Sequence, residues 1–286
     1  MIDVAFTPAE GRVAGVAVVI DVLRATTTAT QALASGFSRV LCVDSLERAL
    51  RMQARGRLLA GEQHGKKPPG FDLGNSPADV ARDPADVADV AREPADVALD
   101  PADVGRDRAE ELVLATTNGA PTIVEAARRA PLVLLACLLN FDAVRAELAG
   151  VEDVQIVCSG TYGEIALEDV YVAGRLCAEL SGARTDAALA AEAVARAYPS
   201  AYDVLAASAN AKALVATGLG EDIEFCARES TLGIVPRVER TRPGLAVVVR
   251  EMTVAREKVD GAGNVESVVA PAGAGPERAT EPQPTT

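Results

Sequence analysis

The sequence has no tryptophan, one histidine and few other aromatic residues, which make up 3% of its 286 positions although 49% are hydrophobic. Alanine and valine must therefore build most of any core. The lone histidine, His64, is the only base available to a Ser-His-Asp triad. No serine and acid are placed around it, so the sequence does not indicate this class of hydrolase.

Cysteines are few and irregularly spaced. The five thiols, an odd number without a Cys-x-x-Cys pair, indicate neither a zinc site nor a disulfide framework. The chain also lacks a signal peptide and any apolar run of membrane-spanning length. We therefore expect a cytoplasmic protein with reduced thiols and no membrane partner.

Positive charge is scarce. Lysine and arginine total 28 against 41 aspartates and glutamates, which gives a formal net charge of −13. This surplus of acid argues against nucleic acid and anionic membrane surfaces as partners. A small anionic substrate is still compatible with it, because a few local cations or a bound metal can reverse the sign of the charge inside one cleft.

Strand-like and helix-like segments alternate along the chain. We expect strands at residues 2–6, 16–20, 39–43, 57–60, 112–115, 132–136 and 153–157, with one or two more within 233–251. We expect helices at residues 30–36, 45–55, 120–129, 140–148, 167–180, 185–197, 202–217 and 219–226. This pattern predicts an α/β fold with a mostly parallel or mixed sheet and helices on its faces.

The segment 77–107 differs from the rest. Pro-Ala-Asp-Val begins at positions 77, 84, 94 and 101, and the segment holds nine acids against three arginines. Because recurring proline prevents a continuous helix, we interpret it as an acidic surface insertion, disordered or made of short helical turns. We expect one domain at 1–252, interrupted by this repeat, and a disordered C-terminal extension at 253–286.

Polar or glycine-bearing residues follow four of the predicted strands. Asp21 and Arg24 follow the strand at 16–20, and Glu62 follows the strand at 57–60. The other two strands lead into Thr116-Thr-Asn-Gly119 and Cys158-Ser-Gly-Thr161. In a parallel sheet the carboxyl ends of the strands share one edge, where ligands bind. We therefore expect these four strand ends to converge.

The convergent set suits a small anion. Arg24 can bind phosphate, carboxylate or sulfonate at two points, and glycine turns can present N–H groups to an oxyanion. Carboxylates around a cleft suit Mg²⁺, which can polarise a phosphoryl group. Ordinary explanations stay open: Asn118-Gly119 as a common turn, Cys158 as a small buried residue, and Glu168-Asp169 as a solvated helix face. Spacing alone predicts an α/β enzyme that acts on a small anion.

Six motifs, in order along residues 1–237, resemble those of the 2-phosphosulfolactate phosphatase family. They are Ile20-Asp-Val-Leu-Arg-Ala-Thr-Thr-Thr28, Gly61-Glu62, Gly70-Phe-Asp-Leu-Gly-Asn-Ser-Pro77, Thr116-Thr-Asn-Gly119, Cys158-Ser-Gly-Thr161 and Ala166-Leu-Glu-Asp169. The resemblance implies a three-layer α/β/α fold and Mg²⁺-dependent hydrolysis of 2-phosphosulfolactate, or a related 2-phospho-hydroxy acid, to sulfolactate and phosphate. It also implies a place on the route to coenzyme M, and it leaves a homodimer open as the oligomeric state.

The resemblance also implies roles for residues of this chain. Asp21, Glu62 and Asp169 become candidate metal ligands and acid–base groups, and Cys158 matches a cysteine of the family. The candidate substrate-binding residues are Arg24, Thr26, Asn75, Thr117, Asn118, Gly119, Ser159, Gly160 and Thr161. The division of metal binding and proton transfer among the three carboxylates stays open, as does a covalent step at Cys158.

Two alternatives remain. A cysteine hydrolase of the isochorismatase-like kind would use Asp21, Lys66 or Lys67, and Cys158. The non-enzymatic alternative is an anion-binding protein whose acidic repeat contacts a partner. A phosphatase of the haloacid-dehalogenase type needs a second acid two residues after the first, and Leu23 occupies that position. The sequence therefore excludes this last type.

Overall fold

The computed structural model describes residues 1–81, residues 111–250 and the backbone of two short strands at 257–259 and 265–267. The chain divides into two compact units, Met1–Glu251 and Met252–Thr286. The second unit contains an antiparallel pair, β10 (Glu257–Val259) and β11 (Val265–Ser267). Most of the acidic repeat, residues 82–107, and the rest of the expected C-terminal extension lie outside the described residues.

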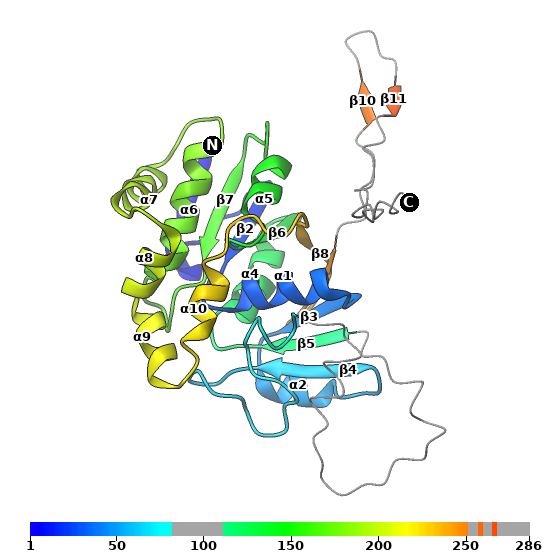
Figure 1. Ribbon diagram of the computed structural model, residues 1–286. Coiled ribbons are helices and arrows are strands. Elements are labelled where there is room, and N and C mark those ends of the chain that lie inside the picture. The colour runs from blue at the N-terminus through cyan, green and yellow to red at the C-terminus, as the bar shows by residue number, and fades with distance from the viewer. Residues whose placement is uncertain (82–110, 251–256, 260–264, 268–286) are drawn as a thin grey trace, which may run out of the picture. The chain divides into compact units, whose positions relative to one another are not determined.

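Strands and helices alternate through the first unit (Figure 1). Its strands are β1 (Ile2–Ala5), β2 (Val16–Ile20), β3 (Arg39–Val43), β4 (Arg57–Gly61), β5 (Glu111–Ala115), β6 (Leu132–Ala136), β7 (Val154–Cys158), β8 (Pro236–Arg242) and β9 (Leu245–Arg250). Its helices are α1 (Ala25–Ser35), α2 (Leu46–Arg51), α4 (Gly119–Arg129), α5 (Phe141–Glu147), α6 (Leu167–Glu179), α7 (Asp186–Ala197), α8 (Ala201–Ala207), α9 (Ala209–Ala216) and α10 (Glu221–Cys226), with a 3₁₀ turn at Pro8–Glu10. Each strand expected from the sequence is present.

Three helices differ from the expectation, and one of them, α2, ends at Arg51 rather than at residue 55. Helix α1 begins at Ala25 rather than at residue 30, because the hydroxyls of Thr26 and Thr27 are buried and donate to main-chain oxygens of the preceding turn. These bonds offset the lower helix propensity of threonine. The helix expected at 202–217 is split at Ser208. Its extended backbone ends α8, and its hydroxyl caps α9 by accepting a main-chain N–H.

The nine strands of the first unit form one sheet in the order β1-β7-β2-β6-β8-β9-β3-β5-β4. Parallel pairing joins β1, β7, β2 and β6 in one block, and β3, β5 and β4 in a second block. The hairpin β8–β9 lies between the blocks and pairs antiparallel with both of them. The prediction of an α/β fold is therefore confirmed, with a mixed sheet.

The hairpin changes the strand directions that a parallel sheet would have. Three antiparallel pairings separate β6 from β3, so the two parallel blocks nominally run in opposite senses. Adjacent strands are also rotated by about 20–25°, and the five steps from β2 to β5 add up to roughly 100–125°. Strands β6 and β8 are paired at a single residue pair, Leu134 and Arg237, and so short a pairing allows this rotation. The carboxyl ends of both blocks therefore reach one cavity although their strands are not parallel to each other.

Helices cover both faces of the sheet. Helices α1 and α4 pack on one face across both blocks, where they bury Val19 of β2, Cys42 of β3 and Leu114 of β5. On the other face, α5 and α6 pack on the first block and α2 packs on the second. This arrangement is the three-layer α/β/α fold that the resemblance implied.

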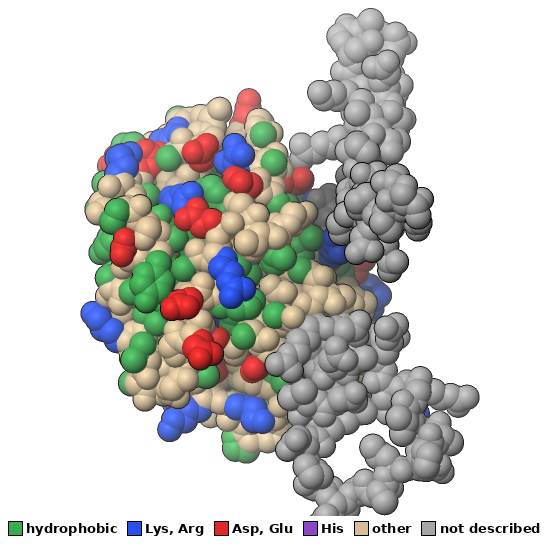
Figure 2. All heavy atoms as spheres, in the orientation of Figure 1, with side chains coloured by type: hydrophobic (Ala, Val, Ile, Leu, Met, Phe, Trp, Pro, Cys, Tyr) green, Lys and Arg blue, Asp and Glu red, His purple; other side chains and the backbone are tan. Residues whose placement is uncertain are grey.

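The surface in view is mixed in charge. On the face drawn in Figure 2, acidic and basic side chains of the described residues are interspersed. The net charge of −13 is therefore not gathered into one block on this face. None of the described helices combines the length and the apolar character needed to cross a membrane.

Candidate functional site

A cavity of about 180 Å³ lies where the two parallel blocks meet. The loops after β2 and β7 enclose it from the first block, those after β4 and β5 from the second, and helices α6 and α9 complete it. Its lining residues are Asp21, Leu23, Arg24, Glu62, His64, Gly65, Asn75, Thr116, Asn118, Gly160, Thr161, Tyr162, Asp169, Asn210, Ala213, Leu214 and Thr217. All four strand ends singled out in the sequence contribute to this lining.

Asp21 follows β2 directly and is buried, with 8% of its surface exposed. Its Oδ1 accepts the Ala25 N–H at 3.0 Å, at the start of α1, and its Oδ2 accepts no hydrogen bond from the described residues. Burial raises the pKa of Asp21 from 3.8 to about 7, with help from the charges of Glu62 and Glu168. Asp21 therefore exchanges its proton near neutral pH, as an acid–base group must.

Asp169 and Glu168 occupy the first turn of α6 and are both buried. The two carboxylate oxygens of Asp169 each accept one main-chain N–H, at 2.9 and 3.2 Å, from the loops after β2 and β7. Burial, and then the charge of Asp21, raises the pKa of Asp169 well above its ordinary value. Glu168 accepts from Asn210 at 2.6 Å and does not line the cavity. The interpretation of this pair as a solvated helix face is therefore wrong.

Glu62 joins two loops of the second block. Its Oε1 accepts the Thr117 N–H at 2.7 Å, and its Oε2 accepts the Gly65 N–H at 2.9 Å. Each oxygen keeps a second lone pair for another donor or a cation. These two bonds fix the carboxylate in the cavity wall.

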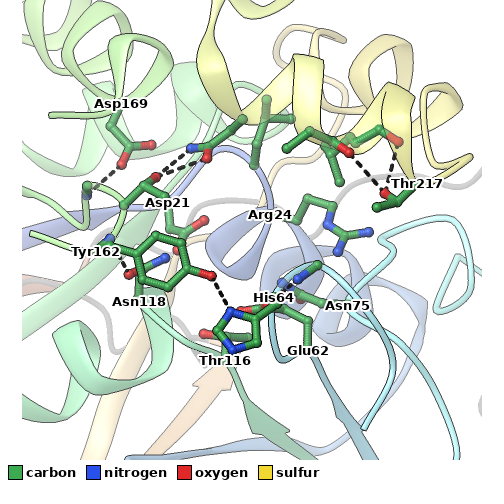
Figure 3. Close-up of a pocket in the computed structure, with 17 residues that line it drawn as sticks. Asp21, Arg24, Glu62, His64, Asn75, Thr116, Asn118, Tyr162, Asp169 and Thr217 are labelled. Atoms are coloured by element: carbon green, nitrogen blue, oxygen red, sulfur yellow. Dashed lines mark hydrogen bonds between the residues drawn. The ribbon is translucent and has the colours of Figure 1, made fainter. Parts of the chain in front are cut away.

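Two tight turns meet at the mouth of the cavity (Figure 3). One follows β4 and the other follows β7, and each is closed by a single antiparallel bridge. His64 and Tyr162 occupy the same position in the two turns, both with a φ of 52° in the left-handed region. His64 Nδ1 lies 3.0 Å from the Tyr162 hydroxyl. This side-chain pair links the two sheet blocks across the mouth.

In Figure 3, Arg24 and Asn75 lie across the cavity from Asp21 and Asp169. Arg24 is 4% exposed, and its Nη1 donates to Asp222 Oδ2 at 2.7 Å, which neutralises part of the guanidinium charge. Asn75 is 3% exposed, and its Oδ1 has no hydrogen-bond partner among the described residues. Leaving a buried amide oxygen without a donor is costly. Its place in a cavity wall indicates that a ligand or water supplies the donor.

Gly119, the first residue of α4, shapes the site without lining it. A Cβ at this position would lie 2.3 Å from Asp21 Oδ2 and 2.4 Å from Ala25 Cβ. The neighbouring Asn118 does line the cavity, and its Oδ1 accepts the Tyr162 N–H at 3.0 Å. Glycine is therefore needed at position 119 for α4 to approach the Asp21 carboxylate.

Gly119→Ala is expected to displace Asp21 and to lower both stability and activity. The added methyl must move either the carboxylate or α4, and overpacking of this kind costs about 1–3 kcal/mol. Urea unfolding would measure the loss against Gly233→Ala, a control at a glycine where an added methyl would meet no heavy atom within 4 Å. Equal unfolding midpoints for the two variants would contradict the packing role.

Besides Gly119, three candidate binding residues do not line the cavity. Thr26 is fully buried with its hydroxyl bonded to the main chain, and Thr117 engages Glu62 through its N–H. Ser159 is 2% exposed, and its hydroxyl has no partner among the described residues.

The turn after β7 does not offer its main chain to an anion. The N–H of Gly160 is already donated to Asp169, and that of Thr161 to the Glu164 carbonyl oxygen. The Thr161 hydroxyl is paired with Asn210 at 3.0 Å. This turn therefore holds Asp169 and Asn210 in place rather than forming an oxyanion hole.

Cys158 ends β7 and is fully buried. Burial, and then the charge of Asp169, raises the pKa of its thiol well above the ordinary value. A nucleophilic cysteine needs an accessible, acidified thiol, and Cys158 has neither property. The structure therefore argues against a covalent step at this residue.

Several lining residues were not singled out from the sequence. Tyr162 follows a glycine-bearing turn and has no further signal in the sequence, which offers His64 only as a possible triad base. Asn210 and Thr217 come from α9 and its end, and no local pattern marks them. No local pattern indicates that Asp222 pairs with Arg24.

A sequence model of the 2-phosphosulpholactate phosphatase family matches residues 4–241. The chain belongs to this family. A probable 2-phosphosulfolactate phosphatase of Thermus thermophilus is 40% identical over 243 residues, which cover 82% of this chain and 92% of the relative. Proteins of the same name from Thermotoga petrophila and Deinococcus radiodurans are each 35% identical, over 240 and 229 residues. These two matches cover 82% and 77% of this chain, and 94% and 86% of the relatives.

The comparisons confirm the resemblance read from the six motifs. The name of the 2-phosphosulfolactate phosphatase family describes phosphoric monoester hydrolases, and each of the six motifs contributes at least one residue to the cavity lining in this chain. Within the described residues, no group of three or more His, Cys, Asp or Glu side chains is arranged to hold a metal ion by itself.

Proposed function

We propose that the chain hydrolyses the phosphate ester of 2-phosphosulfolactate, or of a related 2-phospho-hydroxy acid, with Mg²⁺. The observation that supports this most is a small cavity to which each of the six motifs contributes a lining residue, and in which Asp21 has a pKa of about 7. Water adds to phosphorus and gives up one proton, and the bond from phosphorus to the 2-oxygen breaks. The 2-oxygen takes a proton, which gives sulfolactate and inorganic phosphate.

The charge of the cavity favours a divalent cation. Asp21, Glu62 and Asp169 would meet an anionic phosphate opposite a single arginine, Arg24, which is itself paired with Asp222. Mg²⁺ needs only one or two protein carboxylates and keeps water and phosphate as its other ligands, so these oxygen donors fit it. We assign Asp21 as first ligand because its Oδ2 is free of hydrogen bonds to the described residues, with Glu62 and Asp169 beside it. When bound, Mg²⁺ neutralises phosphate charge and polarises the P–O bonds.

The other groups of the cavity orient the ester and move the proton. Arg24 keeps N–H groups beyond the one donated to Asp222 and can donate them to an anionic group of the ester. Asn75 can accept a hydrogen bond at its unpartnered Oδ1 from the attacking water or from the 2-hydroxyl of the product. Asp169 holds its proton to a higher pH than an ordinary carboxyl. We therefore assign to it the protonation of the departing 2-oxygen.

The two alternatives make different demands. A cysteine hydrolase requires Cys158 to ionise and reach the substrate, and its thiol is fully buried with a raised pKa. A non-enzymatic anion-binding protein would use the same cavity but release no phosphate. Both alternatives can be separated from the phosphatase by one set of assays.

Phosphate release from racemic 2-phosphosulfolactate, with Mg²⁺ or with a chelator, is the deciding measurement. We expect Mg²⁺-dependent release that is faster than with 2-phosphoglycerate, phospholactate or an aryl phosphate. Alkylation of the native protein should leave the rate unchanged, because all five cysteines are buried. If alkylation abolishes the activity and chelation does not, the result would favour the cysteine hydrolase over the phosphatase. If a folded sample binds the substrate but releases no phosphate, the result would favour the non-enzymatic anion-binding protein.

A further inference from the structure

A second cavity opens behind Arg24. Its volume is about 870 Å³, against about 180 Å³ for the first. Arg24, Gly65, Asn75 and Thr217 line both cavities and so form the boundary between them. The two cavities are therefore adjacent.

The two cavities differ in charge. Three carboxylates line the first, whereas the second is lined by Lys66 and Lys67, two of only four lysines in the sequence. Two aspartates also line it, but Asp72 Oδ2 accepts the Leu59 N–H at 2.7 Å, and Asp79 has a partner of its own. The Lys66 ammonium makes no ion pair with the described residues. An anionic group is therefore attracted to the lysine side of the boundary.

The segment that carries the lysines is fixed to the sheet. Two main-chain hydrogen bonds, of 2.9 and 3.1 Å, close the turn between Gln63 and Lys66. Beyond the lysines, Phe71 and Leu73 are buried, and the Asn75 carbonyl oxygen accepts a hydroxyl from α1 at 3.0 Å. The backbone of both lysines is thus held next to the boundary residues.

The boundary has unused polar capacity. Asn75 is 3% exposed, and its Oδ1 has no partner among the described residues. Arg24 donates its Nη1 to Asp222, and the residue lines both cavities. The remaining N–H groups of Arg24 suit the anionic groups of a ligand held at this boundary, and the Asn75 oxygen suits a donor bound beside the ligand, such as water.

We propose that the second cavity is a specificity subsite for the second anionic group of the substrate, a sulfonate or carboxylate. The proposal rests on the phosphatase function proposed above. The phosphate stays at the Asp21 end, and Arg24 contacts the middle of the ester. The ammonium groups of Lys66 and Lys67 attract the distal anion. Phosphate esters without such an anion lose this interaction.

The double variant Lys66→Gln/Lys67→Gln tests the subsite. Its KM for 2-phosphosulfolactate should rise about tenfold or more, with a smaller change in kcat, because the distal anion is bound in the ground state and the transition state alike. The inhibition constant of inorganic phosphate, which needs only the first cavity, should change less than about twofold. Lys212→Gln is the matched control, since this exposed lysine of α9 lines neither cavity.

Two further measurements complete the test. An equal rise in KM for phospholactate assigns the carboxylate to the subsite, and a rise for 2-phosphosulfolactate alone assigns the sulfonate. Calorimetric titration with sulfolactate needs no turnover, so a weakened Kd in the double variant supports the subsite even if no ester is hydrolysed. An unchanged KM and Kd, or an equal shift for inorganic phosphate, would overturn it.

Discussion

Asp21→Asn is expected to abolish turnover and, at the same time, to stabilise the metal-free protein at neutral pH. Asparagine keeps the shape of the side chain, and its Oδ1 can still accept the Ala25 N–H that Asp21 accepts at 3.0 Å. It offers no charge to a cation and no proton to exchange. Positioned acid–base groups contribute about 10²–10⁴-fold, so kcat should fall by about 100-fold or more.

The stabilisation follows from proton binding. Folded Asp21 keeps its proton up to a pH of about 7, whereas the same carboxyl in the unfolded chain titrates near 3.8. Between these values the folded state binds more protons, so the free energy of unfolding falls as pH rises. At about 1.4 kcal/mol per pKa unit, the destabilisation above pH 7 is at most about 4 kcal/mol. The variant lacks this term, so its advantage is absent below the unfolded pKa and complete above the folded one.

Urea unfolding in a chelator, from about pH 4 to about pH 8, measures the effect. Asp153→Asn is a control of opposite sign, because hydrogen bonding to Arg12 lowers the pKa of Asp153. Its folded carboxyl adds stability above the unfolded pKa, and this is lost as pH falls through the folded pKa. Asp153→Asn should therefore weaken the protein throughout this pH range, because the stabilisation by Asp153 is lost only below the unfolded pKa. If the difference in unfolding free energy between Asp21→Asn and the unmodified protein does not change with pH, the raised pKa of Asp21 is refuted.

The elements of this fold and part of its site could be predicted from local sequence. Val16–Ile20 is five consecutive apolar residues, all buried in β2, and such a run is readable without tertiary information. Asp21, Glu62 and Asn118 were chosen because they follow strands, and all three line the cavity. The rule that ligands bind at the carboxyl ends of strands works here, because the chain leaves the core at each strand end.

What could not be predicted depends on contacts between distant residues. The hairpin β8–β9 lies in the middle of the sheet, and its own sequence does not predict which strands it pairs with. Asp222 meets Arg24 across 198 positions of sequence. The convergence of strand ends was predicted from a parallel sheet, whereas twist across a mixed sheet produces it. Burial, which removes Cys158 from the chemistry, is likewise a property of the packed fold.

Removing one partner of the Arg24–Asp222 pair is expected to cause a large loss of stability. The two side chains are 3% and 4% exposed, and their atoms are 2.7 Å apart. Asp222→Asn preserves shape, including acceptance of the Ser76 hydroxyl at Oδ1, but leaves the guanidinium buried without a counter-charge. Such uncompensated charges cost about 3–5 kcal/mol. The free energy of unfolding in urea is the quantity to measure.

An exposed ion pair is the matched control. Arg48 and Asp44 lie 2.9 Å apart with 35% and 39% of their side chains exposed, and pairs of this kind contribute about 0–1 kcal/mol. Asp44→Asn should therefore have a small effect. If Asp222→Asn costs no more than Asp44→Asn, Arg24 is better solvated than its burial indicates.

The double variant Arg24→Met/Asp222→Leu separates structure from chemistry. Replacing both members of a buried ion pair with apolar residues is often neutral or stabilising, so much of the stability lost in Asp222→Asn should return. Activity should not return, because the apolar pair cannot bind an anion at the boundary between the two cavities. A stable and inactive double variant would mean that Arg24 serves substrate binding, with Asp222 holding its guanidinium in place. A stable variant with full activity would remove Arg24 from the proposed site.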